Sequence, residues 1–151
     1  MNPQLIQWLS IFYRLALALW VGGAALFTFI LTPALFKSFD RDTAGNIVGV
    51  LFPGYFRWGL VLGAITLFCL LLVRGRQWVT SAIIVVIMLL MTSVQAFVIE
   101  PQAAAIKKEI PSFVTTPADH PLRQKFKKLH GISAVGNLGV IGGGIALIIL
   151  L

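Results

Sequence analysis

Charged residues are scarce in this chain of 151 residues, because Asp, Glu, Lys and Arg together make up only 11% of it. A typical soluble domain has roughly 25% of these residues. Hydrophobic residues make up 58%. This composition excludes an ordinary soluble domain and predicts an integral membrane protein. A hydrocarbon core about 30 Å thick needs about 20 apolar residues per helix, so the length has room for four spans and little else.

Cysteine and histidine are rare as well. Cys69 is the single cysteine, so no disulfide can form within the chain. The two histidines, His120 and His130, stand apart, and no His or Cys cluster has the spacing of a metal site. The sequence also lacks paired carboxylates in a common span and a Ser/His/Asp set. It therefore leans away from an enzyme, and no cofactor or metal is expected.

Acidic residues number five against twelve basic ones, which gives a net charge of +7. The basic residues lie in loops between apolar runs, where they report topology and attract anionic lipid rather than nucleic acid. Lys and Arg are concentrated in the first and third loops. The positive-inside rule therefore predicts that both termini lie on the non-cytoplasmic side and the third loop in the cytoplasm.

The apolar runs predict an all-α membrane protein, a single domain formed by a bundle of four transmembrane helices. We expect spans at about residues 5–36, 54–73, 78–100 and 130–151, an interfacial helix at 43–52 and a cytoplasmic hairpin at 101–129. Pro53-Gly54 should kink the second helix, and Asp42 or Thr43 should cap the start of the helical stretch before it. Helices three and four should extend beyond the membrane.

The hairpin is predicted from two apolar stripes at helical spacing. The first stripe consists of Ile99, Ala103, Ile106 and Ile110, and the second of Leu122, Phe126 and Leu129. Because both lie in otherwise polar extensions, we expect the two stripes to pack against each other outside the bilayer.

Glycines recur at intervals that bring membrane helices close together. Helix two carries Gly59 and Gly63, and helix four carries Gly136, Gly139 and Gly143. Small residues at this spacing allow a neighbouring backbone to approach, either within one monomer or in a homodimer.

Polar residues inside apolar spans are the candidates for a site. His130, Ser133 and Asn137 share one stripe of the fourth helix. With Gln95, Glu100 and Arg57, they are predicted to form a polar pocket that opens to the cytoplasm, in which Glu100 pairs with His130. Such a pocket could bind a proton, a cation or an anionic head group. Alternatively, the same residues only clamp the helices in register.

Three segments together resemble the transmembrane protein 205 family of small four-span membrane proteins, often filed as a domain of unknown function. They are residues 39–56, Ile99-Glu100-Pro101 with the alanines that follow, and residues 122–139. The resemblance implies a four-span fold but no agreed activity. The vertebrate member is associated with platinum-drug resistance and membrane trafficking, and the thiol motifs invoked there have no counterpart beside Cys69. Copper-resistance membrane proteins and the four-helix protoporphyrinogen oxidase are similar in topology only.

Three functions remain open from the sequence. The first is a membrane protein that binds or passes a small solute, ion or lipid through the polar pocket. The second is a non-catalytic accessory or scaffold subunit of a membrane complex. The third is a haem or porphyrin-linked redox protein in which His130 is the axial ligand. The expected partners are the bilayer, with anionic lipid at the basic hairpin, and a second copy or a membrane-complex subunit.

Overall fold

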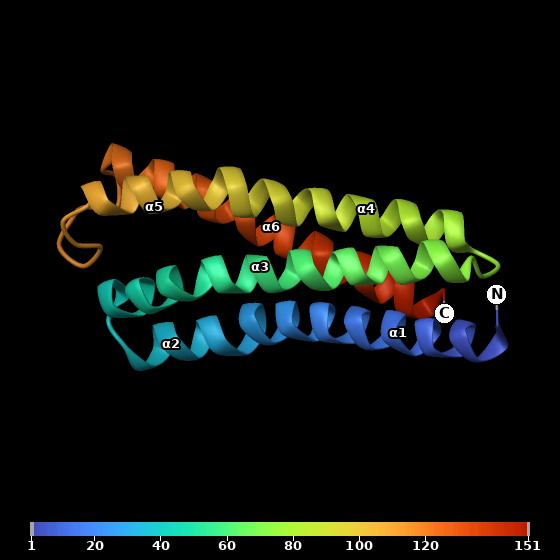
Figure 1. The fold of residues 1–151 in the computed structure, drawn as a ribbon. Coiled ribbons are helices and arrows are strands. Elements are labelled where there is room, and N and C mark those ends of the chain that lie inside the picture. Colours follow the sequence, from blue (N-terminus) through green and yellow to red (C-terminus); the bar gives the residue numbers. More distant parts are fainter. Residues whose placement is uncertain (1, 151) are drawn as a thin grey trace.

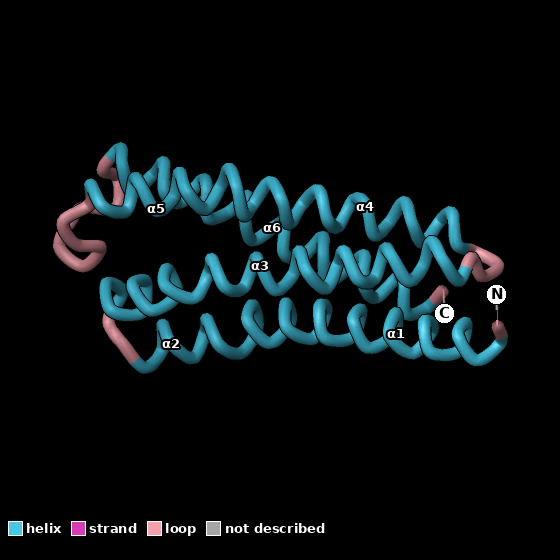
Figure 2. The backbone as a smooth tube through the Cα atoms, in the orientation of Figure 1, coloured by secondary structure: helices cyan, strands magenta, loops and turns pink. Residues whose placement is uncertain are grey.

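Four long helical spans form an antiparallel bundle in the computed structural model, which describes residues 2–150 (Figure 1). The first span runs through α1 (Pro3–Leu26), the π-helical segment η1 (Phe27–Leu31) and α2 (Thr32–Ser38), and the second is α3 (Arg41–Val73). The third runs through α4 (Trp78–Val94), η2 (Gln95–Ile99) and α5 (Glu100–Glu109), and the fourth is α6 (Pro121–Ile149). The described residues outside them form short connections (Figure 2), so the predicted all-α class is confirmed.

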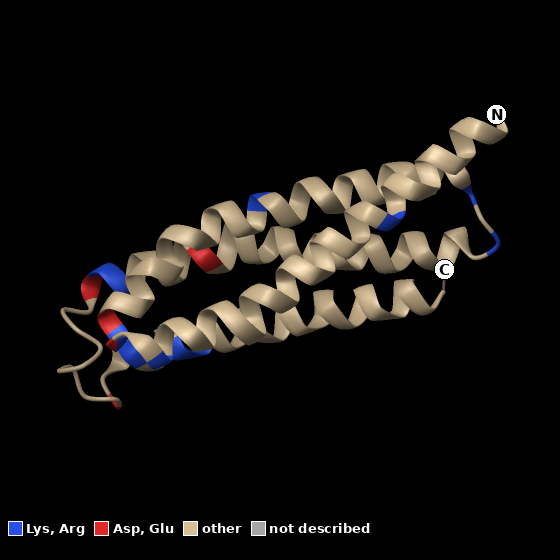
Figure 3. Cartoon of the chain, turned by 90° about the horizontal axis from the view of Figure 1, so that it is seen from below, with Lys and Arg blue, Asp and Glu red and all other residues tan. Residues whose placement is uncertain are grey.

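Each span is long and apolar enough to cross a membrane. The spans have 29 to 36 residues and a mean hydropathy of 2.0 to 2.6. At 1.5 Å per residue they measure about 44–54 Å, more than the roughly 30 Å of a hydrocarbon core. Their ends therefore project from the apolar layer, and most charged residues gather at the end that carries connection 110–120, here called the basic end (Figure 3). The protein is a multi-pass membrane protein.

Neighbouring helices follow one another around the bundle, with α3 between α1 and α4, and α6 between α4 and α1. The largest fully buried side chains are Leu17, Thr66, Val85, Met88 and Leu147. Lipid is about as apolar as these side chains, so close packing rather than removal from water holds the helices together.

Two tryptophans fit reciprocally into glycine gaps between α1 and α3. Trp20 of α1 lies over Gly59, where an added Cβ would stand 3.0 Å from the indole nitrogen. Trp58 of α3 lies over Gly23, where the corresponding distance is 3.4 Å. Each helix therefore supplies one tryptophan and one glycine that receives the partner's tryptophan, and these two contacts set the register of α1 against α3.

The start of α3 differs from the sequence prediction. Residues 43–52 form no separate interfacial helix but belong to the same helix as residues 54–73, and Pro53 lies inside it. A proline removes a single backbone donor, and Val48 and Phe56 on either side are buried in the bundle, so the helix continues. The N-cap of α3 is Asp40, and not Asp42 or Thr43 as predicted. The Asp40 carboxylate accepts hydrogen bonds from the backbone N–H groups of Asp42 and Thr43, each at 3.0 Å.

The two apolar stripes pack against each other, as the sequence predicts. Ile99, Ile106 and Ile110 of the first stripe are buried together with Leu129 of the second. The predicted spans 5–36 and 78–100 lie inside the longer helical stretches Pro3–Ser38 and Trp78–Glu109. The fourth helix begins at Pro121, before the predicted start at residue 130, and the predicted end at residue 151 lies outside the described residues.

Asp42 does not cap α3. Its side chain instead holds connection 110–120 against the start of that helix. Its carboxylate accepts hydrogen bonds from the Ser112 hydroxyl at 2.5 Å and from the Phe113 backbone N–H at 2.6 Å. Lys107 of α5 lies on the same face of α3, with its ammonium 3.5 Å from the position of a Cβ added at Gly49. These contacts join the hairpin to the second span.

Candidate functional site

A polar cluster joins three helices in the interior of the bundle. The Tyr55 hydroxyl of α3 donates a hydrogen bond to Oδ1 of Asn137 on α6 at 3.1 Å. Nδ2 of Asn137 donates to the Thr28 hydroxyl of η1 at 3.4 Å. Asn137 is 8% exposed, so its amide is satisfied mainly by these two partners. Polar groups inside a membrane protein are far less costly when they face protein than when they face lipid.

A second polar contact lies one helical turn away on α6. The Ser133 hydroxyl donates to Oε1 of Gln95 at 3.1 Å, and the Gln95 amide donates to the Met91 carbonyl at 3.3 Å. Gln95 is only 3% exposed. The face of α6 that carries Ser133 and Asn137 thus contacts both η1 and η2 by way of hydrogen-bonding side chains.

Both contacts occur at π-helical segments. Thr28 lies in η1 and Gln95 begins η2, and each segment is followed by a residue and then proline, Thr32-Pro33 and Glu100-Pro101. A proline ring collides with the carbonyl four residues earlier, and a wider turn relieves that collision. π-Helical turns are frequent at functional sites. The two segments share a similar sequence, FTFILTP at residues 27–33 and QAFVIEP at residues 95–101, and this repeat is the signal from which both could have been predicted.

An open groove of about 410 Å³ runs between the first span and α3. It is lined by Gly23, Phe27, Leu31, Leu51, Gly54, Tyr55 and Trp58. The rings of Phe27 and Tyr55 stack with their centroids 4.5 Å apart. Trp58 is 48% exposed, so the groove opens on the outer surface of the bundle, which faces lipid in a membrane.

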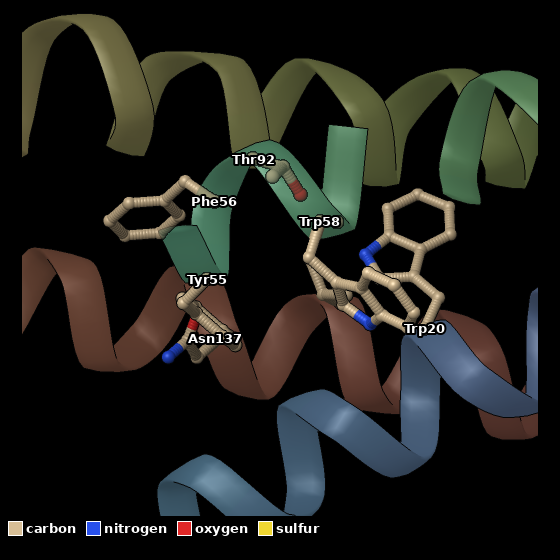
Figure 4. Close-up of a pocket in the computed structure, with 8 residues that line it drawn as sticks. Trp20, Tyr55, Phe56, Trp58, Thr92 and Asn137 are labelled. Carbon is tan, nitrogen blue, oxygen red and sulfur yellow. The ribbon is translucent and has the colours of Figure 1, made fainter. Parts of the chain in front are cut away.

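A much smaller cavity of about 10 Å³ lies behind the groove. Its lining residues are Trp20, Tyr55, Phe56, Trp58, Gly59, Thr92, Asn137 and Val140. Figure 4 shows Tyr55 and Asn137 meeting at one end, with Trp20 and Trp58 at the other. This volume is about that of one water molecule. Tyr55 and Trp58 line both spaces, so they form the wall between the groove and the polar interior.

The predicted pocket residues divide into two sets. Gln95, Ser133 and Asn137 lie at the polar contacts described above, together with Thr28 and Tyr55, which the sequence analysis did not single out. Thr28 and Tyr55 are uncharged. An isolated Thr or Tyr in an apolar span has no sequence pattern that predicts a hydrogen bond to another helix.

The other predicted residues lie elsewhere. Glu100 is half-buried in α5, and Arg57 is exposed on α3. His130 is exposed, and its ring stacks on Phe126 of the same helix at a centroid distance of 6.3 Å. Within residues 2–150, the hydrogen bonds that α6 makes to other helices involve Ser133 and Asn137, and none joins Glu100 to His130. The direct pair that the sequence suggested is therefore not seen as a hydrogen bond among the described residues, and the His130 ring instead lies against Phe126.

The predicted packing glycines lie against side chains of neighbouring helices. A Cβ added at Gly59, Gly63, Gly136, Gly139 or Gly143 would stand between 2.5 and 3.0 Å from Trp20, Leu89, Gln95, Met91 or Met88, respectively. As for metal, the described part of the chain has no group of three or more His, Cys, Asp or Glu side chains that could hold an ion.

Comparison with known proteins identifies the family. Residues 15–112, more than half of the chain, match the family described as "Domain of unknown function (DUF4149)". A relative described as an uncharacterized protein of Aquifex aeolicus (strain VF5) is 32% identical over 131 residues, which cover 85% of this chain and 87% of the relative. No solved structure matches the chain. Neither match shows membership of the transmembrane protein 205 family, which stays a prediction. The chain belongs to the DUF4149 family.

Proposed function

We propose that this protein binds an amphipathic molecule that enters sideways from the lipid phase. The apolar part of the molecule lies in the groove between the first span and α3, and its polar head reaches Tyr55. The observation that carries the proposal is the position of Tyr55, which lines the open groove on one side and hydrogen-bonds Asn137 on the other.

The sizes of the two spaces decide between lipid and a water-soluble solute. The inner cavity of about 10 Å³ has room for about one water molecule, so a solute would have to displace side chains to enter. The groove of about 410 Å³ falls within the roughly 300–1,000 Å³ of small-molecule sites. Its lining is apolar except for the Tyr55 hydroxyl and the Trp58 indole nitrogen, which favours a largely apolar ligand.

Two exposed glycines allow a sharp test. Gly54 lines the groove, and a Cβ added there meets nothing within 4 Å, so Gly54→Leu fills the groove without a backbone collision. Gly22 is equally open but does not line the groove, so Gly22→Leu is the matched control. Native mass spectrometry of detergent-purified protein counts retained lipid molecules. We expect wild type and Gly22→Leu to retain lipid and Gly54→Leu to lose it. Equal retention by all three proteins would refute the proposal.

A second candidate, the accessory or scaffold subunit, is favoured by the direct contact between Gln95 and Ser133. Such a hydrogen bond between helices contributes about 0.6 kcal/mol on average in membrane proteins. Under this alternative, Ser133→Ala lowers the thermal midpoint and leaves lipid retention unchanged. We also propose that the basic end faces the cytoplasm and that its exposed Lys125, Lys127 and Lys128 contact anionic lipid.

A further inference from the structure

The head group that fits the groove can be specified further from the hydrogen-bonding groups that face it. This step rests on the proposed function, because it concerns the ligand of the same groove. Three properties of the groove lining support the choice of head group. They are its lack of charge, the direction of the Tyr55 hydrogen bond and the space that it leaves for an acyl chain.

No ionised side chain lines either space. The lining residues of the groove and of the inner cavity include no Asp, Glu, Lys, Arg or His. Arg57 precedes Trp58 in the sequence but does not line the groove. A charged head group would therefore lose its hydration at Tyr55 without gaining a counter-ion, and burial of an unpaired charge is costly. The lining favours an uncharged head.

The Tyr55 hydroxyl has already used its proton. It donates to Oδ1 of Asn137 at 3.1 Å, so its oxygen can only accept a further hydrogen bond. A ligand that bonds this oxygen must therefore supply a donor. An ester or ketone oxygen can accept only from the Trp58 indole N–H and leaves the Tyr55 oxygen without a partner, whereas an alcohol can accept from Trp58 and also donate to Tyr55. We infer that the groove takes a neutral amphiphile with a free hydroxyl head, of the monoalcohol type represented by diacylglycerol, whose hydroxyl donates to the Tyr55 oxygen.

The remaining length of the ligand follows the groove outward. Phe27, Leu31 and Leu51 form its apolar wall, and Gly54 leaves open space beside them, since a Cβ added there meets nothing within 4 Å. Because Trp58 at the rim is exposed to the surrounding lipid, an acyl chain in the groove is continuous with the bilayer.

The test compares three dioleoyl probes that differ only at the head. Dioleoylglycerol is neutral and has a hydroxyl, its 3-acetyl ester is neutral without one, and dioleoyl phosphatidic acid is anionic. Each is titrated into delipidated protein and followed by native mass spectrometry. Binding that disappears in Gly54→Leu is counted as groove binding, which separates it from phosphatidic acid bound at the basic end.

The matched variants are Tyr55→Phe and Tyr13→Phe, since these are the two tyrosines of the chain and Tyr13 lies in the bundle core away from the groove. We expect wild type and Tyr13→Phe to bind dioleoylglycerol in the groove about threefold to tenfold more tightly than its acetyl ester, as one hydrogen bond provides. Tyr55→Phe should abolish this preference, and phosphatidic acid should show no groove binding.

Each contrary outcome has a distinct meaning. If the acetyl ester or phosphatidic acid binds the groove as tightly as dioleoylglycerol, the head-group assignment is wrong while the lipid-binding function stands. If no probe shows binding that depends on Gly54, the lipid-binding function itself is wrong. A thermal melt of each variant excludes loss of folding as the cause.

Discussion

The side-chain amide of Gln95 lies directly on the backbone of Gly136. A Cβ added at residue 136 would stand 2.8 Å from both Cδ and Nε2 of Gln95, closer than real Cβ contacts occur. The same Gln95 accepts the hydrogen bond of Ser133, one turn earlier on α6. Hence η2 and α6 can come together here only because residue 136 has no side chain.

Replacing Gly136 with Ala should destabilise the bundle. The new methyl group pushes the buried Gln95 amide away and strains or breaks its bond to Ser133. Overpacking of this kind costs about 1–3 kcal/mol, measurable as a lower thermal midpoint in detergent. Gly142→Ala is the control, because its Cβ meets nothing within 4 Å and Ala favours the helix. Equal midpoints for the two variants would contradict the close approach.

Asp42→Ala should release connection 110–120 from α3. The Ser112 hydroxyl and the Phe113 N–H both lose their acceptor. Hydrogen bonds to charged groups contribute about 1.5–3 kcal/mol, so local opening should become about tenfold or more frequent. Limited chymotrypsin digestion at Phe113 in detergent measures it. Asp119→Ala is the control, since that exposed side chain has no such role. An unchanged cleavage rate in Asp42→Ala would show that the tether is unimportant.

The thermal midpoint should fall when the solution is acidified, in part through Asp40. Hydrogen bonds from the Thr43 hydroxyl and backbone hold the pKa of this carboxyl below its ordinary value of 3.8. A group with a lowered folded pKa contributes stability above its unfolded pKa and loses it as pH falls through the folded pKa. The contribution should therefore be complete above about pH 4 and decline below it.

Asp40→Asn separates titration from capping. Asn is an equally good N-cap, so the variant should keep most of its stability at pH 7 and have a shallower acid slope than wild type. Melting curves collected between pH 7 and pH 3 provide the comparison. Parallel slopes would mean that Asp40 titrates with its ordinary pKa in the folded protein.

The proposed orientation can be read from cysteine labelling. Cys69 is 3% exposed, so the native thiol should give little background. Gly75 and Thr115 are exposed in connections at opposite ends of the bundle. A membrane-impermeant maleimide applied to intact cells should label Gly75→Cys, and Thr115→Cys only after permeabilisation, because the positive-inside rule retains the basic end in the cytoplasm. The reverse pattern would invert the proposed topology.

The amino-acid sequence by itself determined that the chain is a four-span membrane protein with paired extensions. Scarcity of charge and long apolar runs specify which segments leave water, and the stripe of Ile99, Ile106 and Ile110 repeats at the helical period. These are local properties, so they could be read without coordinates.

Only the tertiary structure decided which polar residues meet. Asn137 was recognised on its stripe, but its partners Thr28 and Tyr55 come from two other helices. Glu100 and His130 both lie at the edges of apolar runs in the sequence, yet no hydrogen bond joins them in the part of the chain that the structure describes. Which faces meet depends on the rotation and register of packed helices, and here those were set by contacts between distant segments, such as Trp20 on Gly59 and the wider turns before Pro33 and Pro101.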